Sequence, residues 1–233
     1  MVENKDAFEE GYFWEYYMDL ERQFIEYLNY VPYLEGNEKT YSFRLANLIL
    51  SIGSHIDSAF KEIARYSEFS GKYPEMLKPK DEYGKPRFPE IIDYYPINSE
   101  YSLSERKIMF KVIPKRVPIK PFENYKEKGQ AVPRWWAHHN KIKHNFNKDT
   151  FQLANLMTAR DALAGAFLLN VAHKPAAVRL SEYNLLIGKH NSHPIKLQLA
   201  EYYFKDTKPP ATIETEVFFY DYEDNPAYKW IST

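Results

Sequence analysis

Three of the seven histidines in this 233-residue chain lie within one short stretch that also holds its clearest candidates for chemistry. An imidazole takes up or gives up a proton near neutral pH, and a neighbouring lysine or arginine can hold a negatively charged substrate. If the protein does chemistry, we expect that chemistry to be centred here. The stretch reads Arg134-Trp135-Trp136-Ala137-His138-His139-Asn140-Lys141-Ile142-Lys143-His144-Asn145-Phe146.

The spacing within this stretch decides which side chains can act together. On a helix, Asn140 and His144 are four residues apart and share one face. His139 is five residues from His144 and therefore lies about 140° around the helix axis from it. His139 and His144 converge only if the start of the helix is distorted or if two chains meet.

Neither a metal site nor another cofactor is predicted. The chain has no cysteine, which excludes disulfides, thiolate nucleophiles, iron–sulfur clusters and cysteine-based zinc sites. The adjacent His138 and His139 point to different faces, and no His-Glu-x-x-His or Asp-x-x-His spacing accompanies them. Ser54, His55 and Asp57 contain the residue types of a hydrolase, but the glycines of a nucleophile elbow do not accompany them.

Two features are typical of nucleic-acid binding, and each has a simpler alternative. Trp135 and Trp136 could stack on unpaired bases, but such a pair more often fills a core, and Pro133 just upstream favours the core. The net charge of −1 gives no general attraction to polyanions. A local set of basic residues could line an RNA groove or simply form a solvated face: Lys111, Lys115, Arg116, Lys120, Lys126, Lys128, Arg134, Lys141 and Lys143.

Three amphipathic helices are predicted to position the stretch. Apolar residues recur at steps of three and four from about residue 7 to 31, and again from about 41 to 67 behind Thr40 or Ser42 as N-cap. A third stripe follows Asp149 or Thr150 and ends before Pro175. Its small residues at 162 and 164–166 suit close packing of helix on helix.

Two other segments are not expected to be helical. Residues 72–133 contain most of the 15 prolines and short β-like runs such as residues 108–113. A loop of this length usually carries function or packs through its own aromatic residues. Residues 196–204 and 212–222 are rich in β-branched and aromatic residues and flank a turn-like segment, 206–211, so a terminal β-hairpin is expected.

Length and composition predict one folded domain with a small appendage. We expect a helical domain over residues 1–175, within which residues 72–133 form a long insertion rich in proline and tyrosine, and a C-terminal extension over residues 176–233. No window approaches the ~18 consecutive apolar residues of a membrane helix, and the sequence starts with neither a basic nor an apolar signal region. A cytoplasmic protein with no membrane partner is expected.

The run His139-Asn140-Lys-Ile-Lys-His144-Asn-Phe146 resembles the Arg-Asn-x-x-x-His-x-Tyr motif of the HEPN superfamily, helical domains found in prokaryotic toxins, defence systems and RNA-processing enzymes. The surroundings are similar to a HEPN-like branch with the pattern Pro-x-Trp-Trp-x-x-Tyr-Asn-x-x-Lys-His. The resemblance spans about residues 8–173 and implies a mainly α, up-and-down helical bundle. Its other motifs are Pro121-Phe122-Glu123-Asn124-Tyr125, Pro133-Arg134-Trp135-Trp136 and Asp161-Ala162-Leu163-Ala164-Gly165.

The resemblance implies RNA as substrate and a reaction without metal, in which a ribose 2′-hydroxyl attacks the adjacent phosphate. Such a reaction needs a proton acceptor or donor near neutral pH and a cation on the phosphoryl oxygens. Carried over to this chain, His144 takes the acid/base place and Asn140 the supporting polar place. Phe146 stands at the motif tyrosine, and His139 at the motif arginine.

The exchange of arginine for His139 matters, because a neutral imidazole holds phosphate less well than a guanidinium does. Arg134, five residues before His139, is an alternative partner, and Lys141 and Lys143 are alternative sources of positive charge. A metal-independent endoribonuclease is thus the first hypothesis. Because Phe146 also lacks the tyrosine hydroxyl, a catalytically degenerate module for binding or assembly is the second.

The resemblance also implies partners. A homodimer would bring two copies of the His144 segment together, and a toxin–antitoxin or phage-defence setting would add a protein partner such as an antitoxin. A third hypothesis, a binder of nucleotides or other small molecules, rests on the aromatic-rich composition alone.

Overall fold

The computed structural model describes residues 11–112, 117–126, 131–197 and 211–226 and is mainly helical, with one small antiparallel sheet. The α-helices of these residues are α1 (Tyr12–Leu28), α2 (Phe43–Arg65), α3 (Ser67–Ser70), α4 (Tyr95–Tyr101), α5 (Arg134–His144), α6 (Lys148–Phe151), α7 (Leu156–Ala172) and α8 (Lys174–Glu182). The strands are β1 (Ile108–Phe110), β2 (Val117–Ile119), β3 (Ile187–Gly188), β4 (Ala211–Glu214) and β5 (Phe218–Asp221).

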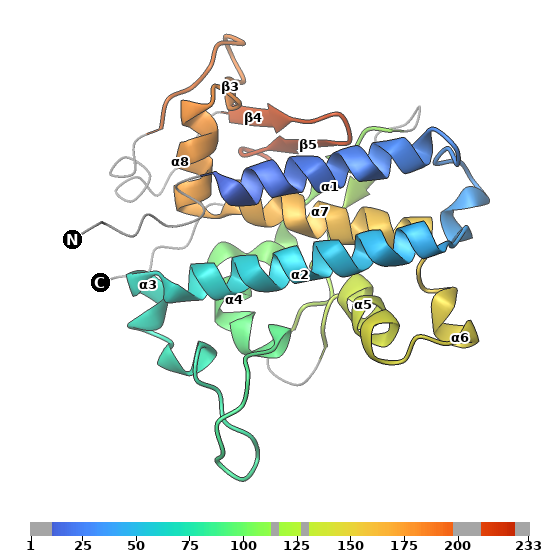
Figure 1. Ribbon diagram of the computed structural model, residues 1–233. Helices are drawn as coiled ribbons and strands as arrows, with labels where there is room; N and C mark the ends of the chain where they lie inside the picture. Colours follow the sequence, from blue (N-terminus) through green and yellow to red (C-terminus); the bar gives the residue numbers. More distant parts are fainter. Residues whose placement is uncertain (1–10, 113–116, 127–130, 198–210, 227–233) are drawn as a thin grey trace.

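Helices α1, α2 and α7 form the centre of the molecule (Figure 1). The buried face of α2 follows the predicted apolar stripe, whereas α7 is buried on all sides from Ala162 to Ala172. Ser42 caps α2, as one of the two predicted candidates, by accepting a hydrogen bond from the Leu45 amide at 3.1 Å. Helices α2 and α7 begin side by side, because the Leu156 amide donates to the Thr40 carbonyl at 3.0 Å. The small residues of α7 are buried, so this helix packs closely on its neighbours.

The predicted start of the third helix was wrong. Asn147 caps the short helix α6, and the chain then breaks before α7. The break follows from Asn155, whose side chain accepts a hydrogen bond from the Thr158 amide at 3.0 Å and so caps a new helix. Helix α7 ends at Ala172, before Pro175, as expected; Pro175 then lies in the first turn of α8.

The described parts of residues 72–133 pack through their own aromatic side chains, one of the two expected outcomes for this segment. It contains α4, β1, β2 and three short 3-10 helices, η2 (Pro74–Met76), η3 (Ile91–Tyr94) and η4 (Leu103–Glu105). Its buried rings include Tyr94, which stacks on Phe60 of α2 with 5.5 Å between ring centroids. The segment thereby fixes the chain that leads into α5.

A C-terminal hairpin exists, but its strands are not the predicted ones. Strands β4 and β5 both lie near the second predicted run, and the turn between them falls at residues 215–217. A buried carboxylate explains the turn: Glu21 of α1 accepts hydrogen bonds from the Thr215 hydroxyl at 2.6 Å and the Val217 amide at 2.8 Å. The predicted first strand, residues 196–204, lies mostly outside the described residues.

The hairpin is the centre of a sheet with the order β2-β1-β5-β4-β3. Strand β5 pairs with β1, which comes from the long segment before α5. Helix α8 spans the predicted domain boundary at residue 175, and side chains from both sides of that boundary share one hydrophobic core. The sheet lies above α1 and α7 in Figure 1, and α5 lies below α2.

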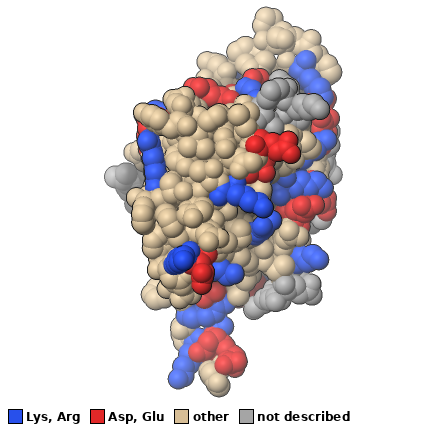
Figure 2. Space-filling view, turned by 90° about the vertical axis from the view of Figure 1, so that its right-hand side faces the viewer, with Lys and Arg blue, Asp and Glu red and all other residues tan. Residues whose placement is uncertain are grey.

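The charged side chains on the face seen in Figure 2 are mixed in sign. Lysines and arginines are interspersed with acidic residues on a largely uncharged surface. Among the described residues, no helix is long and apolar enough to cross a membrane.

Candidate active site

Helix α5 carries the candidate residues and presents them on different sides. It starts after Pro133 and is regular from Arg134 to His144. Its inner face packs on α2 and α7 through buried residues, while the rest of the helix is exposed or half-buried. The exposed set is Arg134, Asn140, Lys141, Lys143 and His144.

Three of the four motif residues, His139, Asn140 and His144, line one cleft between α5, α2 and the η3 segment. We call this cavity of about 630 Å³ the histidine cleft. His139 and His144 both line it from the regular helix α5, because the cavity extends around the helix. The described residues that line it are Gly53, Ser54, Asp57, Ser58, Pro89, Glu90, Ile91, Ile92, Val132, Trp136, His139, Asn140, Lys143 and His144.

His139 is the most confined of these groups. It is only 3% exposed, and its ring lies 4.9 Å from the Trp136 ring and against Gly53 of α2. Burial, with a smaller contribution from the Lys143 charge, lowers the pKa of His139 from 6.5 to about 4. His139 is therefore neutral at neutral pH, so it supplies no positive charge to a phosphate.

The wall opposite α5 is polar. Ser54, Asp57 and Ser58 line the cleft from α2, and Asp57 is paired with Lys61 at 2.5 Å between Oδ2 and Nζ. Glu90 adds a second carboxyl at the start of η3. The cleft thus combines His144, Asn140 and Lys143 on one side with hydroxyl and carboxyl groups on the other.

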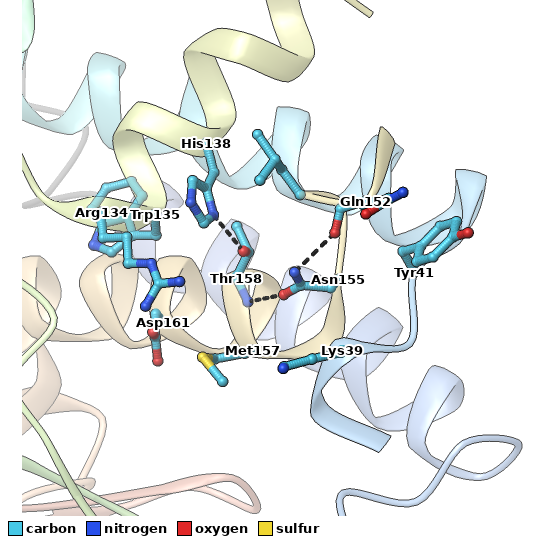
Figure 3. A pocket seen from close by; sticks show the side chains of 11 residues that line it. Lys39, Tyr41, Arg134, Trp135, His138, Gln152, Asn155, Met157, Thr158 and Asp161 are labelled. Atoms are coloured by element: carbon cyan, nitrogen blue, oxygen red, sulfur yellow. Dashed lines mark hydrogen bonds between the residues drawn. The ribbon is translucent and has the colours of Figure 1, made fainter. Parts of the chain in front are cut away.

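A second cavity, of about 340 Å³, lies on another side of α5, and Figure 3 shows its lining. We call it the arginine cleft. Arg134 and His138 enter it together because they are four residues apart, and His138 Nδ1 is hydrogen-bonded to Thr158 Oγ1 at 2.8 Å. Burial and the neighbouring Arg134 lower the pKa of His138. The cavity is lined by Lys39, Tyr41, Arg134, Trp135, His138, Gln152, Leu153, Asn155, Met157, Thr158 and Asp161.

The structure separates Arg134 from His139 and His144. The alternative pair of Arg134 with His139 is not formed, because Arg134 lines the arginine cleft and His139 lines the histidine cleft. Phe146 does not line the histidine cleft either. It is half exposed and packs against Phe43 and Phe151, with ring centroids 6.1 and 5.5 Å away.

The two tryptophans belong to the core. Trp135 is 3% exposed and donates a hydrogen bond from Nε1 to the Pro121 carbonyl at 2.7 Å, while Trp136 is 7% exposed. Both side chains are almost fully buried, although Trp135 lines the arginine cleft and Trp136 the histidine cleft, so they offer little surface on which a base could stack. The structure therefore agrees with the alternative that this pair fills the core.

Those basic residues of the predicted groove that the structure describes do not all lie on α5. Lys141 and Lys143 are exposed on α5. Lys111 instead forms an ion pair with Glu214 and donates to the Thr215 carbonyl at 2.6 Å. The predicted groove also included Lys115, Arg116 and Lys128, which lie outside the described residues.

Sequence reasoning missed the partners of α5 in both clefts. In the histidine cleft, the polar stripe of Gly53, Ser54, Asp57 and Ser58 has the helical spacing that could have revealed it. Lys39 and Tyr41 precede α2 and reach the arginine cleft only through tertiary packing. Within the described parts of the chain, no group of three His, Asp or Glu side chains is placed to hold a metal ion.

The contact between Gly53 and His139 gives a test of this geometry. A Cβ added at Gly53 would collide with the His139 imidazole. Gly53→Ala should therefore destabilise the protein by about 1–2 kcal/mol, because overpacking outweighs the gain in helix propensity. In a His139→Ala background the same change should stabilise it by up to about 1 kcal/mol. Urea unfolding of the four proteins measures both effects, and the same sign in both backgrounds would contradict the contact.

Comparison of the chain with protein-family models, with curated proteins and with solved structures found no significant match.

Proposed function

We propose that this protein is a HEPN-like protein that acts on RNA, as a metal-independent endoribonuclease, through the histidine cleft. One observation carries the proposal. The residues at the motif positions, His139, Asn140 and His144, line one cleft together with Lys143. All four residues come from helix α5.

The proposed reaction is attack of a ribose 2′-oxygen on the adjacent phosphorus. A base takes the 2′-hydroxyl proton, the bond from phosphorus to the 5′-oxygen breaks, and an acid returns a proton to the leaving oxygen. The products are a 2′,3′-cyclic phosphate and a 5′-hydroxyl. His144 is the proposed proton-transfer group because it is exposed at the cleft and free to meet solvent and substrate.

The other residues have supporting roles in this proposal. Lys143 provides the positive charge that faces the phosphoryl oxygens. Asn140, four residues before His144 on the same helix, provides an amide that can hold the substrate or orient the imidazole. His139 shapes the base of the cleft as a neutral, buried ring. A homodimer would set a second His144 opposite the first, so that one serves as base and the other as acid.

A second candidate function is a HEPN-like binding or assembly module without nuclease activity, with a protein partner such as an antitoxin. A specific observation favours it: none of the described residues that line the histidine cleft is an arginine, and two of them, Asp57 and Glu90, are acidic. A guanidinium would bind the phosphoryl group in the transition state more strongly than the Lys143 ammonium does, because it donates two parallel hydrogen bonds.

The experiment that separates the two functions is incubation of the purified protein with single-stranded and total RNA in EDTA. We expect cleavage, with 2′,3′-cyclic phosphate at the new ends, because no step of the proposed reaction uses a metal ion. Analysis of the fragment ends by phosphatase and kinase treatment makes the measurement. Intact RNA in EDTA, at protein concentrations where the RNA is bound, would establish the binding module instead.

A further inference from the structure

The arginine cleft has a surplus of positive charge. Neither Arg134 nor Lys39 has an ion-pair partner among the described residues. Asp161, the acidic residue of this cavity, is already bound by Arg160, with 2.6 Å between Nη2 and Oδ1. Arg160 thus provides most of the counter-charge of Asp161, and the charge of Arg134 provides a smaller part. With Arg134 and Lys39, the lining of the cavity holds two cations and one carboxylate that is already ion-paired.

The start of α7 adds to this surplus. The helix dipole puts partial positive charge at its first turn, next to the cavity. The Leu156 amide is used by the Thr40 carbonyl and the Thr158 amide by the Asn155 side chain. The Met157 amide has no partner within the part of the chain that the structure describes, so one backbone donor is left at the wall of the cavity.

The cavity is not only cationic, because it also has an aromatic end. Tyr41 is 46% exposed, with one side of its ring held by the edge of Phe151 at 5.1 Å between centroids. Figure 3 places Tyr41 and Arg134 at opposite ends, with Lys39 and Asn155 between them. A volume of about 340 Å³ lies within the range of small-molecule sites.

From these observations we propose that the arginine cleft binds a nucleoside monophosphate, with the phosphate on Arg134 and Lys39 and the base against Tyr41. A guanidinium binds phosphate through paired hydrogen bonds, and an open tyrosine ring suits a flat base. Gln152 lies near Tyr41 in the lining of the cavity, and its side-chain amide can meet the polar edge of the base. This site is separate from the histidine cleft, and its occupation does not depend on RNA cleavage.

Isothermal titration calorimetry with adenosine 5′-monophosphate tests the proposal. We expect saturable binding to the intact chain, tighter than that of adenosine or inorganic phosphate alone, because only the nucleotide reaches both ends of the cavity. Arg134→Gln should weaken it by about tenfold to a hundredfold, through loss of a charged hydrogen-bonding partner. Tyr41→Leu should weaken it as well, whereas Tyr30→Leu, at a tyrosine that is 80% exposed elsewhere, should not.

Lys143→Gln in the histidine cleft is the control for the location of the site. We expect this variant to bind the nucleotide as the wild type does. Absence of binding, equal affinity for inorganic phosphate and the nucleotide, or a larger loss in Lys143→Gln than in Arg134→Gln would each overturn the assignment. Circular dichroism of every variant, compared with the wild type, separates loss of binding from loss of fold.

Discussion

His144→Ala should lower the rate of RNA cleavage by about 10²- to 10⁴-fold, the usual contribution of a positioned proton-transfer group. His144 lines the histidine cleft from the last residue of α5 and is exposed to solvent. Its truncation removes an imidazole without opening a cavity in the core, so the fold and the unfolding free energy should change little. Initial rates on a single-stranded RNA substrate in EDTA measure the effect.

The matched control for this variant is His190→Ala. His190 is also exposed, with a side-chain exposure of 76%, and lies near Glu223, away from both clefts. Its removal should leave the cleavage rate unchanged. Equal rates for wild type and His144→Ala would remove His144 from the mechanism, and a similar loss in His190→Ala would point to a contaminating nuclease or to damage of the fold.

Lys143→Gln and Arg134→Gln extend the same assay to the source of positive charge. Lys143 lines the cleft with His144, whereas Arg134 is turned into the other cavity by its place on the helix. The mechanism therefore assigns the phosphate contact to Lys143, in place of the arginine that the motif resemblance expects at position 139. This arrangement follows from helix geometry, because Arg134 is nine residues before Lys143 and therefore lies about 180° from it around the helix axis.

The sequence was a good guide to the parts of the fold that depend on local periodicity. The stripe of α2 and its Ser42 cap follow from i, i+3 and i, i+4 spacing alone, and so does the shared face of Asn140 and His144. The start of α7 was missed because Asp149 and Asn155 are both reasonable caps. Two hydrogen bonds select Asn155: the Thr158 amide donates to the Asn155 side chain, and the Leu156 amide donates to the Thr40 carbonyl.

The parts of the fold that depend on contacts between distant residues could not be predicted from local periodicity. The hairpin turn at Thr215 is set by a carboxylate 194 residues earlier in the chain, Glu21. Strand β1 likewise pairs with β5, and Met109 lies opposite Phe219, 110 residues later in the chain. The polar wall of the histidine cleft belongs to α2, where Ser54 and Asp57 had suggested only an unsupported hydrolase set. In the structure these two residues lie opposite α5 and form part of the polar wall of the cleft.

Acidification should weaken the fold strongly, because several histidines are buried in the neutral form. Burial lowers the pKa of His55 and of His139 from 6.5 to about 4, and that of His173 also falls through burial. Between pH 6.5 and 4 the unfolded chain binds more protons at these sites than the folded chain does. The free energy of unfolding must then fall as the pH falls through this window. The stability that the neutral histidines contribute is fully present above pH 6.5.

The size of this effect can be isolated at His55. Its ring lies 5.4 Å from Phe13 and 5.2 Å from Tyr16, so His55→Phe should retain the packing and remove the titration. A pKa of 6.5 unfolded and about 4 folded corresponds to about 2 kcal/mol lost between pH 7.5 and 5. Urea unfolding at both pH values should show a loss smaller by about this amount in His55→Phe.

The raised pKa values of Glu21 and Asp161, both caused by burial, act in the opposite direction, since the folded state then holds the extra protons. They contribute equally to wild type and variant and cancel in the comparison. His190→Gln, at an exposed histidine, should lose stability on acidification as the wild type does. If His55→Phe also loses as much as the wild type, His55 is not held neutral by the fold, and the acid sensitivity must arise from the other histidines whose pKa burial lowers, His138, His139 and His173.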